Sequence, residues 1–232
     1  MSLFGSRIRY DRKRILGEAE RARARGRNRK AIALYRLVLA AEPRNIEIHA
    51  RIAPLLVKTR ERFDAWQSYS RVAAAFTSHG QHGKALSVYQ EATRVLPTRF
   101  EAWMAVARLE LRLGEKSRAR DSLIEGRRRM KRRGRRAEAI ALLRAAREID
   151  AWHAATVLDL AALLAASRRG QEARWLLSQL AERMHGWELA RVRAHQWRME
   201  PSLRHSWYWI RDSARASRSA SDVPGFRESQ RI

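Results

Sequence analysis

The chain has 232 residues, of which 45% are hydrophobic and none is cysteine, and its formal net charge is +25. This hydrophobic content is sufficient for a folded core, and the lack of cysteine excludes disulfides, cysteine metal sites and thiol catalysis. The charge favours an anionic partner: nucleic acid, an acidic protein or an acidic lipid surface. Because most of the positive charge is arginine and alanine is abundant, the codon bias of a GC-rich genome is an alternative explanation of the excess.

Residues 1–11 are expected to form a basic N-terminal extension. They lack the apolar stretch and the cleavage site of a secretory signal. No hydrophobic run in the sequence approaches the roughly 20 residues that span a bilayer. We therefore expect a cytoplasmic protein.

Apolar residues recur at helical spacing along most of the remaining chain, and turn residues separate the helical segments. In chain order, helices are predicted over about residues 10–25, 28–41, 45–58, 62–78, 82–96, 99–113, 116–131, 135–149, 151–167, 170–184, 187–199 and 202–216. Pro54 falls inside the third of these helices, where a proline costs about 3 kcal/mol or kinks the helix.

The helix between Gly80 and Pro97 carries the pattern that the other helices repeat. Its Ala85 is small enough for a neighbouring helix to approach closely, and Tyr89, one turn later, fills the adjacent space. Equivalent small residues recur along the sequence in alternating long and short steps, of 34, 20, 34, 20 and 34, which gives every second one a 54-residue period. The six positions are Ala31, Ala65, Ala85, Ala119, Ala139 and Ala173. Turn glycines follow the same 54-residue period at Gly26, Gly80 and Gly134.

These columns resemble the tetratricopeptide repeat, a helix–turn–helix unit whose length equals the longer of the two steps. The family's aromatic, small, glycine and alanine positions are filled by Trp103, Ala107, Gly114 and Ala119. The 20-residue step departs from the family, because it leaves room for one helix only. A bacterial tetratricopeptide-like protein with a 54-residue, three-helix unit is therefore expected. The resemblance implies an all-α, right-handed α-solenoid of about 11–12 antiparallel helices.

The resemblance covers roughly residues 12–185, which we expect to form the repeat domain. Residues 186–213 are interpreted as C-terminal capping helices and residues 214–232 as a disordered tail, because the tail is poor in apolar residues. We favour a cap whose aromatic side chains seal the core; a docking patch is the alternative. The side chains in question are Trp207, Tyr208, Trp209 and Ile210.

No group of residues has the spacing of a catalytic, cofactor or metal site. His79 and His82 bracket a turn without a third ligand, and Gly83-Lys84-Ala85 lacks the first glycine and the hydroxyl residue of a phosphate-binding loop. We therefore expect no enzymatic activity, no cofactor, no metal and no small-molecule ligand.

Two surfaces are candidates for partner binding. The basic patch lies at the turn between the seventh and eighth helices and consists of Arg127, Arg128, Arg129, Lys131, Arg132, Arg133, Arg135 and Arg136. A second basic region lies at residues 7–14 and 21–29. The resemblance also implies a concave groove that holds a peptide or helix, and its positions map onto Lys58, Glu101, Met104, Arg108 and Arg112.

The leading hypothesis is a non-enzymatic scaffold or adaptor that binds an acidic segment of a partner protein. Nucleic-acid binding through the arginine-rich edge is the alternative, although most tryptophans lie at helical core spacing. Attachment to an acidic membrane surface is a third hypothesis.

Overall fold

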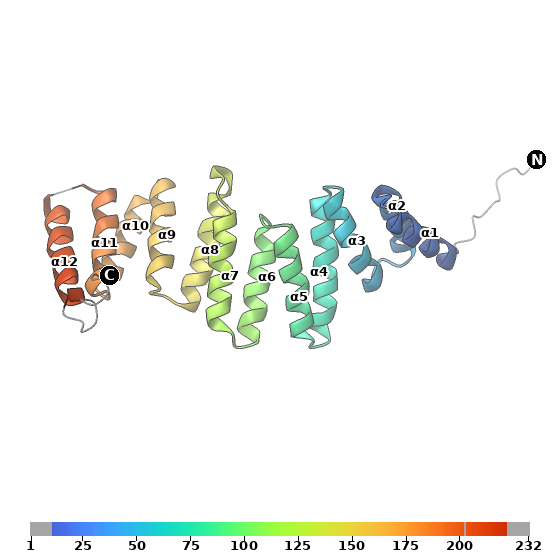
Figure 1. Cartoon of the computed structure of the whole chain (residues 1–232), viewed down its shortest axis with the longest axis horizontal. Coiled ribbons are helices and arrows are strands. Elements are labelled where there is room, and N and C mark those ends of the chain that lie inside the picture. Colours follow the sequence, from blue (N-terminus) through green and yellow to red (C-terminus); the bar gives the residue numbers. More distant parts are fainter. Residues whose placement is uncertain (1–10, 202, 222–232) are drawn as a thin grey trace, which may run out of the picture. The chain divides into compact units, whose positions relative to one another are not determined.

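The computed structural model describes residues 11–201 and 203–221, and these residues form twelve α-helices and no strand. Within α1 to α6, and again within α7 to α12, consecutive helices are antiparallel neighbours (Figure 1). They are α1 (Arg12–Ala24), α2 (Asn28–Ala41), α3 (Ile46–Lys58), α4 (Arg62–Ser78), α5 (His82–Val95), α6 (Phe100–Arg112), α7 (Lys116–Arg129), α8 (Arg136–Ile149), α9 (Ala154–Ala166), α10 (Gly170–Ala181), α11 (Gly186–Met199) and α12 (Leu203–Ser221), with a short 3-10 turn at Arg133–Arg135.

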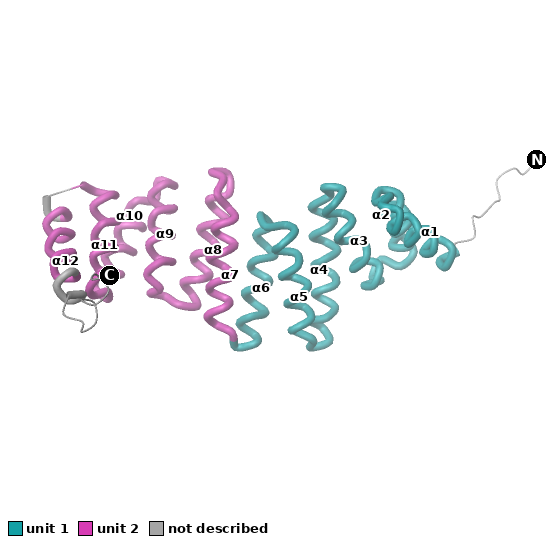
Figure 2. Tube along the Cα trace, viewed as in Figure 1, with its two compact units in different colours: residues 1–114 teal, residues 115–232 magenta. Residues whose placement is uncertain are grey.

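The chain divides into two compact units, residues 1–114 and 115–232 (Figure 2). In each unit the helices pack mainly against their neighbours in the sequence, α1 to α6 in the first unit and α7 to α12 in the second. Packing of this kind is typical of an α-solenoid. The predicted all-α repeat fold is therefore confirmed in both units.

The six small alanines are buried near the starts of their helices. Each is the fourth residue of its helix, in α2, α4, α5, α7, α8 and α10, and each is at most 1% exposed. A methyl group at this position lets the backbone of the next helix come near. Larger side chains one turn later, such as the fully buried Tyr35 and Leu143, fill the space beside it.

Left-handed residues end several helices. Gly26, Gly80 and Gly114 have φ values of +70°, +69° and +82°, as expected for glycines that follow a helix C-cap. Arg60 and Arg168 adopt the same conformation, with φ values of 68° and 61°, although a side chain there costs about 1–2 kcal/mol.

Gly134 lies in the turn before α8, as predicted, within the 3-10 turn Arg133–Arg135. It lacks the positive φ of Gly26 and Gly80, and the connection between α7 and α8 is longer than those before α2 and α5.

Three further predictions compare with the structure as follows. Pro54 lies inside α3, as predicted. Helix α12 continues to Ser221, so residues 214–221 are helical where a tail is predicted; alanine and arginine favour helix strongly enough to extend it. Residues 1–10 of the N-terminal extension and residues 222–232 of the predicted tail lie outside the described residues.

The packing at the alanines leads to a direct test in α2. The substitution Ala31→Leu adds a large side chain at a fully buried contact and is expected to lower the free energy of unfolding by about 1–3 kcal/mol. Ala33→Leu, at an exposed position of the same helix, is expected to change it by less than about 0.5 kcal/mol. Urea unfolding followed by circular dichroism measures both; equal effects would contradict the packing role of Ala31.

Candidate cationic binding surfaces

Two of the predicted groove residues form an exposed basic pair on α6. Arg108 and Arg112 lie one turn apart, and both side chains are exposed. Within the described part of the chain, no carboxylate pairs with either guanidinium. Met104 lies half-buried one turn earlier, and Leu111 is 40% exposed beside them. We call Met104, Arg108, Leu111 and Arg112 the α6 face.

Glu101, predicted to line the same groove, is engaged within the chain. Its carboxylate forms an ion pair with the guanidinium of Arg99, in which Oε2 lies 2.9 Å from Nε. The Arg99 guanidinium in turn lies over the rings of Phe63 and Trp66, at 5.9 and 5.6 Å from their centroids. Glu101 therefore fixes Arg99 in this aromatic contact.

Lys58, the last predicted groove residue, lies at the end of α3 and lines a different surface. It borders a cleft of about 770 Å³ whose walls are the turn between α1 and α2 and the turn between α3 and α4. The lining residues are Gly26, Arg27, Asn28, Arg29, Lys30, Lys58, Thr59 and Arg60. Because α2 and α3 are antiparallel, the start of one lies beside the end of the other.

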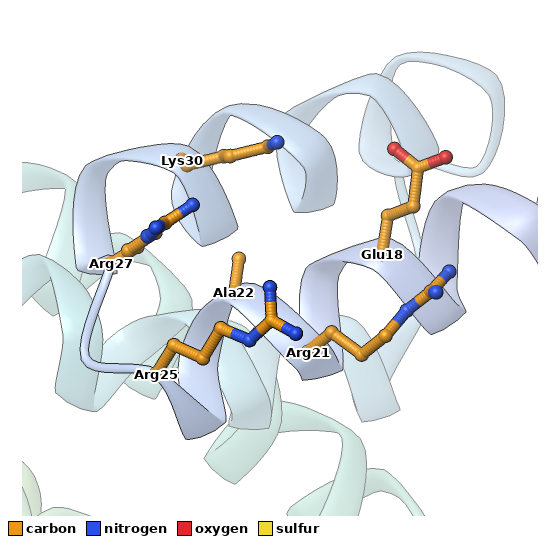
Figure 3. Close-up of a pocket in the computed structure, with 6 residues that line it drawn as sticks. All are labelled: Glu18, Arg21, Ala22, Arg25, Arg27 and Lys30. Atoms are coloured by element: carbon orange, nitrogen blue, oxygen red, sulfur yellow. The ribbon is translucent and has the colours of Figure 1, made fainter.

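A second cleft, of about 230 Å³, adjoins the first and shares Arg27 and Lys30 with it. Figure 3 shows Arg21, Arg25, Arg27 and Lys30 around the space above Ala22, with Glu18 at one side. We call the two clefts together the cationic cleft. Its seven cationic side chains are Arg21, Arg25, Arg27, Arg29, Lys30, Lys58 and Arg60.

A polar contact holds together the three helices that carry the cationic cleft. The Tyr35 hydroxyl of α2 donates to the carboxylate of Glu20 in α1 at 2.5 Å, and Arg51 of α3 donates to the same carboxylate at 2.8 Å. Burial and the bond to Glu20 raise the pKa of Tyr35 to about 12. The phenol therefore stays a donor throughout the physiological pH range.

Four arginines of the predicted basic patch in the second unit pair with three neighbouring carboxylates. Arg127 pairs with Asp159. Burial raises the pKa of Asp159, and the nearby Arg127 guanidinium offsets part of that rise. Arg129 pairs with Glu125 at 2.7 Å and Arg135 with Glu138 at 2.7 Å. Arg128 also reaches Glu125, and Arg136 donates to the carbonyl of Ala166. Three exposed cations keep no such partner in the described structure: Lys131, Arg132 and Arg133.

Five of the eight tryptophans are exposed, which corrects the inference that most lie at core positions. They are Trp175, Trp187, Trp197, Trp207 and Trp209, with exposures of 41–60%. Their ring faces are partly covered by the chain itself. Arg191 lies over Trp187 and Arg211 over Trp207, at 5.1 and 4.8 Å, and Trp197 stacks on Trp209 at 6.3 Å.

The interpretation of the C-terminal aromatic residues as a seal over the core is also wrong for three of the four side chains. Trp207, Trp209 and Ile210 are exposed. The contact of α12 with α11 is instead fixed by Asp212, which is 4% exposed and pairs with Arg193 at 3.4 Å and Arg211 at 2.7 Å.

The described residues contain no group of three or more His, Asp or Glu side chains that could hold a metal ion. None of the helices described is both long and apolar enough to cross a membrane.

Comparison with protein families gives one match, at residues 130–195, to the family described as Tetratricopeptide repeat. Residues 130–195 therefore carry tetratricopeptide repeats. Such repeats generally mediate protein–protein interaction, and the fold is typically a non-enzymatic module. The matched segment covers α8 to α10 and most of α11.

Several solved tetratricopeptide-repeat structures are similar to this repeat protein at low identity. A putative kinesin light chain from Podosopora anserina is 16% identical, with 90% of this chain and 96% of that chain covered and a TM-score of 0.42. A thermophilic TPR protein in Thermus thermophilus is 15% identical, with 92% of this chain and 93% of that chain covered and a TM-score of 0.33. YrrB, described as a TPR protein with an unusual peptide-binding site, is 12% identical, with 87% of this chain and 92% of that chain covered and a TM-score of 0.27. A search of curated proteins finds no match to the sequence.

The pairing of Arg127 with Asp159 predicts that part of the basic patch is structural. Arg127→Gln leaves a partly buried carboxylate without its cation and is expected to lower the free energy of unfolding by about 1–3 kcal/mol. Arg132→Gln, at an exposed position without a carboxylate partner in the described structure, is expected to change it by less than about 0.5 kcal/mol. Thermal and urea unfolding of both variants provide the measurement, and a neutral Arg127→Gln would show that the pair contributes nothing.

Proposed function

We propose that this chain is a cytoplasmic, non-enzymatic adaptor that binds an acidic segment of another protein on the α6 face. The observation that carries the proposal is the exposed pair Arg108 and Arg112, which lack carboxylate partners in the described structure. Elsewhere on the helices, exposed arginines such as Arg94, Arg118 and Arg144 lie in ion pairs with neighbouring glutamates. The α6 pair therefore keeps its charge for a ligand.

The spacing of the pair suits an extended peptide. Residues one helical turn apart have Cβ atoms about 5–6 Å apart. An extended chain presents every second side chain on the same face, about 7 Å apart. Two carboxylates at alternate positions of a peptide can thus reach Arg108 and Arg112 together, and each guanidinium offers a forked pair of donors to its carboxylate.

The apolar part of the α6 face supports a protein ligand. Met104 and Leu111 flank the arginines and leave part of their side chains exposed. Methionine adapts to differently shaped partners, and apolar groups surrounded by charge are typical of interfaces. The preferred segment therefore combines acidic residues with apolar residues at its ends.

We also infer that the repeat is a 54-residue unit of three helices. Support comes from the helix starts, because α2, α5 and α8 begin at positions 28, 82 and 136, with a constant 54-residue interval. Helices α3, α6 and α9 begin at positions 46, 100 and 154, with the same interval. In this arrangement the α6 face belongs to the middle helix of a unit.

A labelled peptide tests the proposed ligand class. A peptide with glutamate at alternate positions and leucine near both ends is expected to bind the full chain, with an affinity that falls as salt rises. The double variant Arg108→Gln, Arg112→Gln is expected to raise the Kd about 2- to 30-fold, because each exposed ion pair contributes about 0.2–1 kcal/mol. Fluorescence anisotropy at low and physiological salt measures both effects.

Two controls separate the α6 face from general charge attraction. The double variant Arg132→Gln, Arg133→Gln removes the same charge from the other unit and is expected to leave the Kd within about twofold. The same peptide with glutamine in place of glutamate is expected not to bind. Equal weakening by the two double variants would contradict the assignment to α6.

A further inference from the structure

The cationic cleft concentrates positive charge that the chain does not neutralise. Within the described structure, none of its seven cations forms an ion pair, although the charge of Arg29 acts on Glu61 at longer range. Arg21 donates from Nε to the carbonyl of Gly17, which leaves its charge uncompensated. Among the lining residues, Glu18 is the single carboxylate. Like charges held this close repel each other, so an anion entering the cleft relieves that repulsion.

Arg60 combines a strained backbone with a place in the lining of the cleft. Arg60 has a φ of 68°, in the turn position that Gly26, Gly80 and Gly114 occupy elsewhere. Glycine would adopt this conformation without strain. Strained backbone of this kind gathers at functional sites, and here the strained residue lines the cleft opposite Arg27 and Lys30.

The lining also indicates the chemical class of the ligand. It contains no aromatic side chain that could stack on a base, and its only apolar side chain is Ala22. An acidic peptide presents one charge about every 7 Å along a face and gains affinity from apolar anchors, which the cleft lacks. Consecutive phosphate groups carry charge more densely, and arginine binds them through forked pairs of hydrogen bonds.

We propose that the cationic cleft is a binding site for an oligophosphate, a ligand made of consecutive phosphate groups. Arg27 and Lys30 line both parts of the cleft and contact the middle of the ligand. Arg21 and Arg25 bind the phosphate on the α1 side, and Lys58 and Arg60 bind the one on the α3 side. The site uses none of the residues of the α6 face, so it can be tested independently of the adaptor function. It adds a small anionic ligand to the protein partner expected from the sequence.

Inorganic triphosphate is the probe for this site. Isothermal titration calorimetry of the full chain at constant physiological ionic strength is expected to show one triphosphate bound per chain. Arg27→Gln and Arg60→Gly are each expected to weaken binding about fivefold or more, which is the effect of losing roughly 1 kcal/mol at an exposed charged contact. Glu18→Gln, which removes the carboxylate at the edge of the cleft (Figure 3), is expected to strengthen binding.

The chain offers a matched control for Arg60. Arg168 has the same left-handed backbone, with a φ of 61°, but does not line the cleft. Both Arg60→Gly and Arg168→Gly relieve backbone strain and are expected to raise the melting temperature. A loss of binding in either variant would therefore not result from unfolding. Only Arg60→Gly is expected to weaken triphosphate binding. Equal loss in both variants would show attraction to the overall charge and would overturn the site.

Two further measurements define the ligand class and separate the two proposals. The glutamate peptide used for the α6 face is expected not to displace triphosphate from the cleft, and displacement at equal affinity would overturn the assignment to phosphates. Arg108→Gln with Arg112→Gln is expected to leave triphosphate binding unchanged. Binding of several triphosphates per chain, without dependence on Arg27 or Arg60, would also overturn the proposal.

Discussion

Close approach of neighbouring helices at buried alanines sets the arrangement on which the other features depend. Each of these alanines is the buried fourth residue of its helix, and its small side chain leaves room for a neighbouring helix to come close. Side chains such as Tyr35 and Leu143 occupy the space one turn further on. Dense packing of this kind leaves little freedom in how adjacent helices meet. It thereby decides which helix ends lie side by side, including the start of α2 and the end of α3 that form the cationic cleft.

Arginine has two different uses in this chain. The sequence contains 49 basic and 24 acidic residues, so 25 cations would remain if every carboxylate neutralised one of them. Some arginines link helices, as Arg51 does through Glu20 and Arg193 through Asp212. Others, on the α6 face and around the cationic cleft, keep their charge exposed. Codon bias explains an abundance of arginine, but it does not explain why unpaired cations from two separate turns line one cleft.

The left-handed arginines show how a repeat architecture tolerates local exceptions. The turn after a helix C-cap requires a positive φ, and glycine satisfies this requirement at residues 26, 80 and 114. Arginine at residues 60 and 168 meets the same geometry at an energetic cost. Since the adjoining helices are held by their own packing, that packing offsets the free-energy cost of the positive φ. The side chain is then available at a turn where glycine would offer none.

The sequence by itself determined the helices, their order and their packing positions, because apolar periodicity, glycines and small residues are local signals that recur along the chain. It also identified Arg108 and Arg112 as neighbours, since one helix carries both. It could not show that Lys58 and Arg60 meet Arg27 and Lys30, because that contact joins two turns with two helices of chain between them. Nor could it show that Asp159 and Glu125 pair with arginines of the basic patch, or that Trp207 and Trp209 are exposed. Pairing of charges and exposure of side chains depend on which surfaces the packed helices bring together, and only the tertiary structure decides this.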